Sequence, residues 1–455
     1  MFTRVIGIDL GVTAAHKAIV FDPATGEFLG KPWSFHPYPA EMDRLLQRAR
    51  RGCPAPVTLA VVLEATGMAW YPVGTYLHDH GAQVYRVNGR QTRALRKALQ
   101  RSAGSDRIDC RVLAQRYQVA HQQLPQWQPP TSAQLALQRA CREFVRWREM
   151  DVAIQNRLIS YDQWAWNGLT RLVPAAARNW VRHHWYDPWR VQAAGVAALT
   201  AAWQASVTDS PAEVDWIPAW VTRATQMTQI YAAPERVGYA ALEATIARNL
   251  ALQAQSRTAR AQLRQQHIQP LYQQLCPERW LESIYGIAAD SAAIYIAFIM
   301  DIPRFPSSAH FRNWCGIVPG SHQSGGFEAK GLPITQAGPD PIKATLYLNA
   351  DVARQWDVQF AARYHRLMVA YGKHHTVAVC ACASHLASRI YTLLTEKRPY
   401  ELRDLQNRPI TIQQSRQLCQ QEYRVPDEVR QRNAVRARRV QREQRVEQRF
   451  VHHTA

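Results

Sequence analysis

The sequence predicts an α/β domain at the N-terminus, then a helical middle region and a mostly helical C-terminal region. Short apolar runs alternate with segments of helical composition over residues 1–122. Helical composition dominates from residue 132 onward, after a Pro/Gln-rich stretch at 122–130 that we interpret as a domain boundary. A chain of 455 residues also exceeds one ordinary domain and can bury a large core without disulfides or a structural metal.

The N-terminal elements follow in an order that predicts a mixed sheet flanked by helices. The apolar run at residues 5–10 is typical of a buried strand. Residues 17–22 predict a second strand, and the turn at 24–27 leads into a third. The remaining predicted elements are a helix at 41–51, β-branched and apolar strands at 57–63 and 83–87, and helices at 89–100 and 106–117.

The middle region, residues 123–276, is predicted to be helical. Residues 240–263 show partial heptad order, which is typical of a long helix or a loose coiled coil that bridges domains or dimerises. Eight of the fifteen tryptophans lie within residues 160–225, among arginines. We interpret them as the aromatic core of a helical insert; the alternative is a surface on which unpaired bases stack.

The C-terminal part divides into a unit at residues 277–400 and a basic tail at 401–455. The unit contains a Gly-rich loop at 316–338, followed by helical segments. In the tail, residues 429–449 hold eight arginines against two glutamates. Such a run is most often a solvated or frayed helix, but beside nucleic acid it would neutralise phosphates.

The charge balance indicates a polyanionic partner. Lys+Arg is 55 against Asp+Glu 35, a net charge of +20, and only seven of the cations are lysines. Arginine binds phosphate bidentately and stacks on bases, although a bias in genomic base composition would also enrich it. We take 291–300 as the most apolar segment, too short to span a membrane, and find no signal-peptide pattern. Eight scattered cysteines without zinc spacing are expected to be reduced, so we expect a soluble cytoplasmic, nucleoid-associated protein with no membrane partner.

Four carboxylates in the N-terminal region form a candidate metal site. Asp9 and Glu64 end two predicted strands, and Asp106 and Asp109 are three apart on a predicted helix, so both project from one face. Clustered carboxylates repel one another and generally need cations, and oxygen ligands favour Mg²⁺, or Mn²⁺, over zinc. Two such ions about 4 Å apart serve in-line phosphoryl displacement.

Each carboxylate also has a structural explanation. The strand-end Asp9 within Gly-Ile-Asp-Leu-Gly would equally suit an actin-like sugar kinase, but the further phosphate and adenosine loops of that fold are missing in order. Glu64 is as well explained as a helix cap. Asp106 and Asp109 could simply complement a helix dipole.

A second candidate site is the serine at position 324, which precedes Gly325 and Gly326. A serine before paired glycines has an exposed hydroxyl, and backbone amides there can approach a phosphate closely. Taken alone, the segment is more simply a polar turn.

Together, the two constellations resemble the transposases of insertion-sequence family 110, whose relatives include pilin-gene DNA invertases. Residues 105–114, Ser-Asp-Arg-Ile-Asp-Cys-Arg-Val-Leu-Ala, are close to the family's form. So are Gly-Ile-Val-Pro at 316–319, Gln-Ser-Gly at 323–325 and the segment 334–338. The resemblance covers roughly residues 4–122 and 280–400. The Trp-rich middle and the arginine tail have no counterpart in it.

The resemblance implies an RNase H/RuvC-like N-terminal fold carrying an Asp-Glu-Asp-Asp set and a C-terminal transposase domain. It also implies a site-specific recombinase that acts on donor and target DNA, is guided by a noncoding bridge RNA, and works as a homodimer or homotetramer. Ser324 would be the nucleophile, assisted by Mg²⁺ on Asp9, Glu64, Asp106 and Asp109. The alternatives are a metal-dependent junction nuclease without serine chemistry and a noncatalytic nucleic-acid-binding derivative of a transposase.

Overall fold

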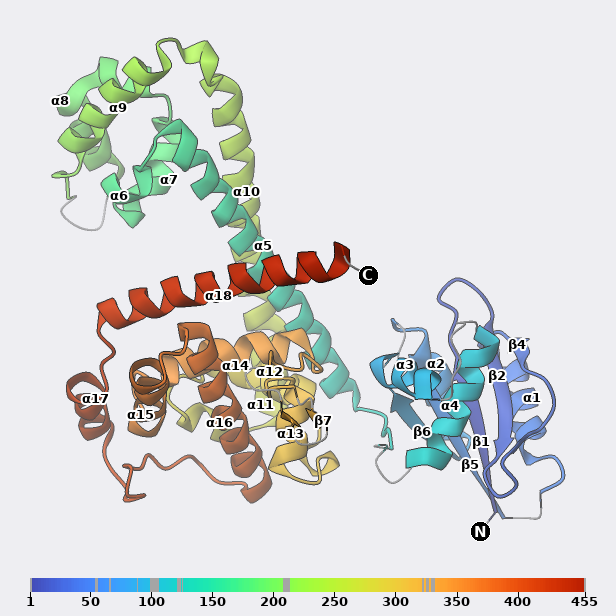
Figure 1. Cartoon of the computed structure of the whole chain (residues 1–455). Helices are drawn as coiled ribbons and strands as arrows, with labels where there is room; N and C mark the ends of the chain where they lie inside the picture. Colours follow the sequence, from blue (N-terminus) through green and yellow to red (C-terminus); the bar gives the residue numbers. More distant parts are fainter. Residues whose placement is uncertain are drawn as a thin grey trace. The chain divides into compact units, whose positions relative to one another are not determined.

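The computed structural model describes residues 2–53, 56–64, 67–87, 89–98, 106–120, 124, 126–207, 213–320, 323–324, 327–328 and 332–453 (Figure 1). The chain divides into two compact units, residues 1–131 and 132–455, and each is described by itself. For Asp106 and Ser324, two of the predicted site residues, the structure describes the backbone but not the side chain.

The first unit is built on a six-stranded mixed sheet with the order β3-β2-β1-β5-β6, in which β4 also pairs with β2. β1 pairs antiparallel with β2 and parallel with β5, and β5 pairs parallel with β6. The predicted fold class, a mixed sheet followed by helical regions, is confirmed. The strands are β1 (Phe2–Asp9), β2 (His16–Asp22), β3 (Glu27–Phe28), β4 (Trp33–Phe35), β5 (Val57–Glu64) and β6 (Ala82–Val87).

Helices cover both faces of this sheet. Residues of α1 (Pro39–Arg50) and α2 (Trp70–Asp79) share a buried cluster with Ile6 and Ile8 of β1. On the opposite face α4 (Asp106–Ala120) packs against the odd-numbered residues of β1 (Figure 1). Gly7 permits this contact, because a Cβ there would lie 2.1 Å from the Cys110 carbonyl oxygen. The fourth helix is α3 (Gly89–Ala98).

The second unit begins with a long antiparallel helix pair, which Figure 1 shows side by side. Ser256 Oγ of α10 donates to the Trp147 carbonyl of α5, and Gln253 donates to Gln155 further along the pair. The segment predicted as a long helix or loose coiled coil is thus a helix that pairs within its own chain. The elements of this part are α5 (Ser132–Ala165), α6 (Leu169–Leu172), α7 (Ala175–His184), α8 (Pro188–Ser206), α9 (Ile217–Tyr231), a 3-10 turn (Pro234–Arg236), α10 (Tyr239–Leu263), a π-turn (Arg264–Ile268) and α11 (Gln269–Leu275).

The tryptophans between residues 160 and 225 mostly build the core of a helical insert, as interpreted from the sequence. Trp166 and Trp220 are fully buried, and their ring centroids lie 5.9 Å apart. Asp162 and Arg182 form a buried ion pair, and Tyr186 of this core donates to Asp162. Of these eight tryptophans only Trp164 is exposed, at 44%, so they offer little surface on which bases could stack.

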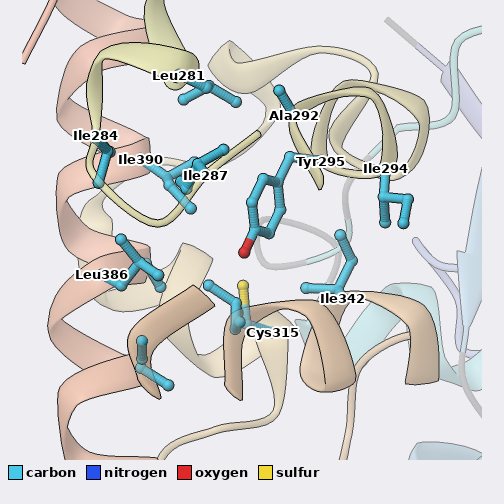
Figure 2. Close-up of a cluster of buried hydrophobic side chains, with 14 of the residues drawn as sticks. Leu281, Ile284, Ile287, Ala292, Ile294, Tyr295, Cys315, Ile342, Leu386 and Ile390 are labelled. Atoms are coloured by element: carbon cyan, nitrogen blue, oxygen red, sulfur yellow. The ribbon is translucent and has the colours of Figure 1, made fainter. Parts of the chain in front are cut away.

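The C-terminal part of this unit is a helical core. Figure 2 shows Tyr295 of α12 at its centre, with the hydroxyl directed towards Cys315 at the end of α13. That hydroxyl donates to Asn349 Oδ1 at 2.7 Å, and Asn349 donates to the Gly286 carbonyl at 2.6 Å. The elements are a 3-10 turn (Trp280–Ser283), α12 (Ala289–Ile299), a 3-10 turn (Ile302–Arg304), α13 (Ser308–Cys315), β7 (Gln323–Ser324), β8 (Phe327–Glu328), α14 (Asp340–Ala353), α15 (Val358–His365), a π-turn (Arg366–Ala370), α16 (His375–Glu396), α17 (Ile412–Gln421) and α18 (Asp427–His453).

α16 is the one helix in the described part of the chain that is long and apolar enough to cross a membrane. The helical segments predicted to follow the Gly-rich loop include this one, at residues 375–394, but the shorter segment at 291–300 was taken as the most apolar, so the apolar character of α16 was not expected. Nine of its residues, including Cys382 and Leu386, are buried in the helical core, which is how the central helix of a folded domain behaves.

Candidate active site

Asp9 and Glu64 stand side by side at the carboxyl ends of neighbouring parallel strands. The register of β1 and β5 pairs Ile8 with Leu63, and each carboxylate is the next residue of its strand. Neighbouring strands lie about 4.8 Å apart, and residues in register point to the same face. That face is the one covered by α4, because Val5 and Val62, an even number of residues earlier, contact it. Both carboxylates are half-buried.

α4 brings the second pair of carboxylates to the same face. Cys110, Leu113 and Ala114 are the α4 residues buried against the sheet. Asp109 lies one turn before Leu113, so helical periodicity puts it on the sheet-facing side, and position 106 lies one turn before Cys110. Burial, and next the Asp9 carboxylate, raise the pKa of the Cys110 thiol to about 12, which shows how near this part of α4 lies to Asp9.

Two cations that the sequence analysis missed flank these carboxylates. Arg96 of α3 donates through one nitrogen to both oxygens of Asp109, at 2.9 and 3.1 Å. Lys17 of β2 is the direct cross-strand partner of Asp9 and donates to Ser34 Oγ. Directly opposed residues of an antiparallel pair share a face, so Lys17 lies on the side of the sheet that carries the carboxylates. Lys17 is also one of only seven lysines, which was the signal available in the sequence.

Glu64 also contacts the start of α3. A Cβ at Gly89, the first residue of that helix, would lie 2.5 Å from Glu64 Oε1, so the Glu64 carboxylate lies against the first turn of α3. The positive end of a helix favours a nearby carboxylate. The structural explanation for Glu64 and a role as a metal ligand are therefore compatible.

The described side chains supply one neighbouring pair of carboxylates, Asp9 and Glu64, but not a complete set of metal ligands. Among them, no group of three or more His, Cys, Asp or Glu residues is close enough to hold an ion. The Asp106 side chain is not among those described, and Asp109 is turned to Arg96. The donor chemistry, carboxylate oxygens on one face of a sheet, suits a hard divalent cation.

The predicted serine lies in a β-hairpin of the second unit. Ser324 of β7 pairs with Phe327 of β8, and Gln323 pairs with Glu328. An outer bridge joins Pro319 to Ile334. These pairings are nested, as in a single hairpin whose base is at residues 316–338. We call this segment the serine hairpin, and Ser324 stands in the innermost described pair.

Two glycines close the base of the serine hairpin on the helical core. Gly316 ends α13 with φ +71°, and the Gln336 amide donates to its carbonyl at 3.0 Å. Gly338 lies so close to α13 that a Cβ there would be 2.1 Å from the Trp314 carbonyl oxygen. Since Cys315 beside them is fully buried, the hairpin starts from a fixed point.

Comparison with known proteins assigns both of these regions to one family. A model of IS110-type DEDD transposases, described as "Transposase", matches residues 6–161, which include the four carboxylates. A second model, described as "Transposase IS116/IS110/IS902 family", matches residues 278–365, which include the serine hairpin. The chain belongs to the IS110 family of transposases. The carboxylates and the serine therefore lie in the two regions by which members of the IS110 family are recognised.

A curated relative supports the assignment. It is the "Insertion element IS110 uncharacterized 43.6 kDa protein" of Streptomyces coelicolor, 28% identical over 123 residues. The alignment covers 27% of this IS110-family chain and 30% of the relative, so the chain spans less than a third of that protein's length.

Proposed function

We propose that this IS110-family protein is a DNA transposase that cuts and rejoins donor and target DNA through a serine nucleophile assisted by carboxylate-bound divalent cations. The observation that carries the proposal is the pairing of Asp9 with Glu64 on the α4 face of the sheet, in a chain that also carries the serine hairpin. A carboxylate pair of this kind would serve phosphoryl transfer, and a serine on a hairpin would serve as an exposed nucleophile.

In the proposed serine step, the energy of the cleaved phosphodiester bond is kept in a covalent bond between the serine and the DNA phosphate. Ser324 Oγ would form a bond to phosphorus, while the bond from phosphorus to one deoxyribose oxygen breaks. The serine loses its proton to a base or to water, and the leaving oxygen takes one up. Attack by a deoxyribose hydroxyl of another strand on the phosphoserine link then rejoins DNA and restores the serine, so no energy source is consumed.

The carboxylates are the proposed ligands of Mg²⁺, or Mn²⁺. Asp9 and Glu64 would be the primary ligands, with Asp106 and Asp109 completing the set. A bound divalent cation polarises a phosphate and stabilises an oxygen that carries negative charge. For Asp109 to take part, its carboxylate must exchange Arg96 for the ion, and Arg96 would then be free to face phosphate oxygens.

The same proposal includes a guide RNA and more than one subunit. With 48 arginines and no zinc finger, basic zipper or clear helix-turn-helix in the sequence, the chain lacks a recognisable base-reading module. RNA paired to the DNA would supply site choice, leaving the protein to contact shape and backbone. Recombination joins several strands, so a homodimer or homotetramer is proposed.

The nucleophile is tested with a suicide DNA substrate whose nicked product diffuses away after cleavage. We expect a covalent protein–DNA adduct that maps by peptide sequencing to Ser324. Ser324→Ala should give no adduct, and Ser321→Ala, three residues earlier in the sequence, should behave as the wild type. Recombination by Ser324→Ala, or an adduct at another residue, would exclude the serine mechanism; cleavage without any adduct would favour the junction nuclease.

The guide is tested on the purified protein. We expect one discrete RNA, encoded beside the gene, to co-purify with it. RNase treatment before DNA is added should stop site-specific recombination, and adding back the same RNA, made by transcription, should restore it. Faithful site choice by RNA-free protein would instead mean that the protein reads the DNA directly.

A further inference from the structure

A group of arginines on the C-terminal helical core surrounds His385 of α16. Arg312 comes from α13, Arg363 from α15, Arg366 from the π-turn that follows it, and Arg389 lies one helical turn beyond His385. We call these four arginines the His385 cluster. Their helices pack together through buried neighbours of these residues, among them Phe311, Phe360 and Leu386.

Within the described part of the protein, an acidic partner neutralises only one of the four arginines of the His385 cluster. Arg389 has an acidic partner, Asp357, at 2.6 Å. Arg312, Arg363 and Arg366 have no ion pair with any described residue, and the Nε atoms of Arg312 and Arg363 are buried without a hydrogen-bond partner. Leaving a guanidinium nitrogen desolvated and unpaired is unfavourable. A bound anion would remove that cost.

The electrostatics of His385 agree with this picture. The residue as a whole is exposed, so the cluster reaches the surface. Desolvation of the ring by its neighbours, and then the charges of Arg363, Arg389, Arg312 and Arg366, lower its pKa to about 4. At neutral pH the ring is therefore uncharged, and the arginines alone attract the anion.

The location of the cluster indicates which anion it holds. Arg312 lies on α13, one turn before Gly316, where the serine hairpin begins. We propose that Arg312, Arg363 and Arg366 bind the phosphate backbone of the duplex DNA whose strand the serine hairpin attacks. The inference rests on the proposed function, in that DNA is taken as the substrate. Guanidinium groups from three elements match a run of phosphates better than a single small anion.

The test compares two triple variants with equal loss of charge. The first is Arg312→Gln/Arg363→Gln/Arg366→Gln; Arg389 is kept because it also holds Asp357. The control is Arg171→Gln/Arg236→Gln/Arg248→Gln, three exposed arginines of the helical insert. Circular dichroism and thermal unfolding establish that both variants are folded. Binding of a fluorescent DNA duplex is then measured by anisotropy between about 50 and 200 mM salt.

Each phosphate contact contributes about 0.9 to the slope of log affinity against log salt, so losing three should reduce the slope by about 2.7. Over a fourfold change in salt, the first variant should thus lose about 40-fold less affinity than the wild type. The control should keep the wild-type slope.

An unchanged slope in the first variant, or an equal loss in the control, would overturn the inference and leave the proposed function intact. A loss seen only with single-stranded RNA of the same length would assign the cluster to RNA instead, and also overturn it. Failure of the wild-type protein to bind the duplex at all would count against the proposed function itself.

Discussion

Replacing Gly7 with alanine tests how closely the two elements of the carboxylate site must approach. Gly7 lies on the α4 face of β1, two residues before Asp9. Its added Cβ would lie 2.1 Å from the Cys110 carbonyl oxygen and 2.6 Å from the Ala114 nitrogen. Both neighbours are backbone atoms of α4, so no side chain can rotate away. The helix must move as a whole.

The size of the effect follows from these distances. Real Cβ atoms essentially never come within 3.0 Å of such neighbours, so α4 must shift by at least 0.9 Å. Overpacking of this kind costs about 1–3 kcal/mol. Since 1.4 kcal/mol is a factor of ten, hydrogen-exchange protection of β1 and α4 should fall by about 5- to 150-fold. A displacement near 1 Å between Asp9 and Asp109 should also lower recombination on the order of 100-fold in the protein that remains folded.

Gly74→Ala, in α2 of the same unit, is the matched control. A Cβ there would meet only the rings of Trp70 and Trp127, at 3.5 Å and beyond, which is ordinary contact. Alanine is favoured over glycine in a helix by about 1 kcal/mol, so this variant should be as stable as the wild type or more so. Equal protection of β1 in the two variants would show that the approach of α4 to Gly7 is not a constraint, and the reasoning would fail.

Four further outcomes are expected. Asp9→Asn or Asp109→Asn should abolish recombination without loss of folding or nucleic-acid binding; near-normal activity at saturating Mg²⁺ removes that residue from the proposed site. Arg96→Gln should strengthen Mn²⁺ binding in calorimetry, because a competing cation is lost, whereas unchanged affinity argues against Asp109 as a ligand. Asp162→Ala should lower the free energy of unfolding by about 3–5 kcal/mol, because its partner Arg182 stays buried without a counter-charge. Hydrogen-exchange protection should fall in α6–α9 but not in α13–α16. The pKa of the Cys110 thiol is raised from 9 to about 12 in the folded protein. Its contribution to the free energy of unfolding is therefore complete below pH 9 and lost as pH rises towards 12. Between pH 9 and 12 the urea midpoint should fall less steeply with pH in Cys110→Ala than in the wild type.

The strand-end carboxylates could be predicted because buried parallel strands leave a strong pattern. Residues 57–63 are a β-branched, apolar run, and the acid that follows it is visible at once. The three-residue strand β4 was missed because an edge segment of that length has no measurable period. α2 was also missed, although Trp70, Val73 and Leu77 have the spacing of one helical face, because Pro72 and Gly74 argue locally against a helix.

The flanking cations could not be predicted because they depend on register and on tertiary contact. Lys17 faces Asp9 only because β1 and β2 pair with that offset, which the sequence of the connecting turn does not reveal. Arg96 meets Asp109 through the packing of α3 on α4. The same applies to the His385 cluster, whose members are scattered over 77 positions between Arg312 and Arg389 and come together only in the folded helical core.

The proposed chemistry draws on both units, and this makes the arrangement of the active site accessible by mixing two inactive proteins. Asp9→Asn keeps the serine, and Ser324→Ala keeps the carboxylates. If one subunit supplies both groups to a phosphate, every site in a mixed oligomer carries one defect and the mixture stays inactive. If the serine of one subunit works with the carboxylates of another, some sites in the mixture combine an intact serine with an intact carboxylate set, and adduct formation returns. The adduct must then map to Ser324 of the Asp9→Asn protein, which a size tag on either chain identifies.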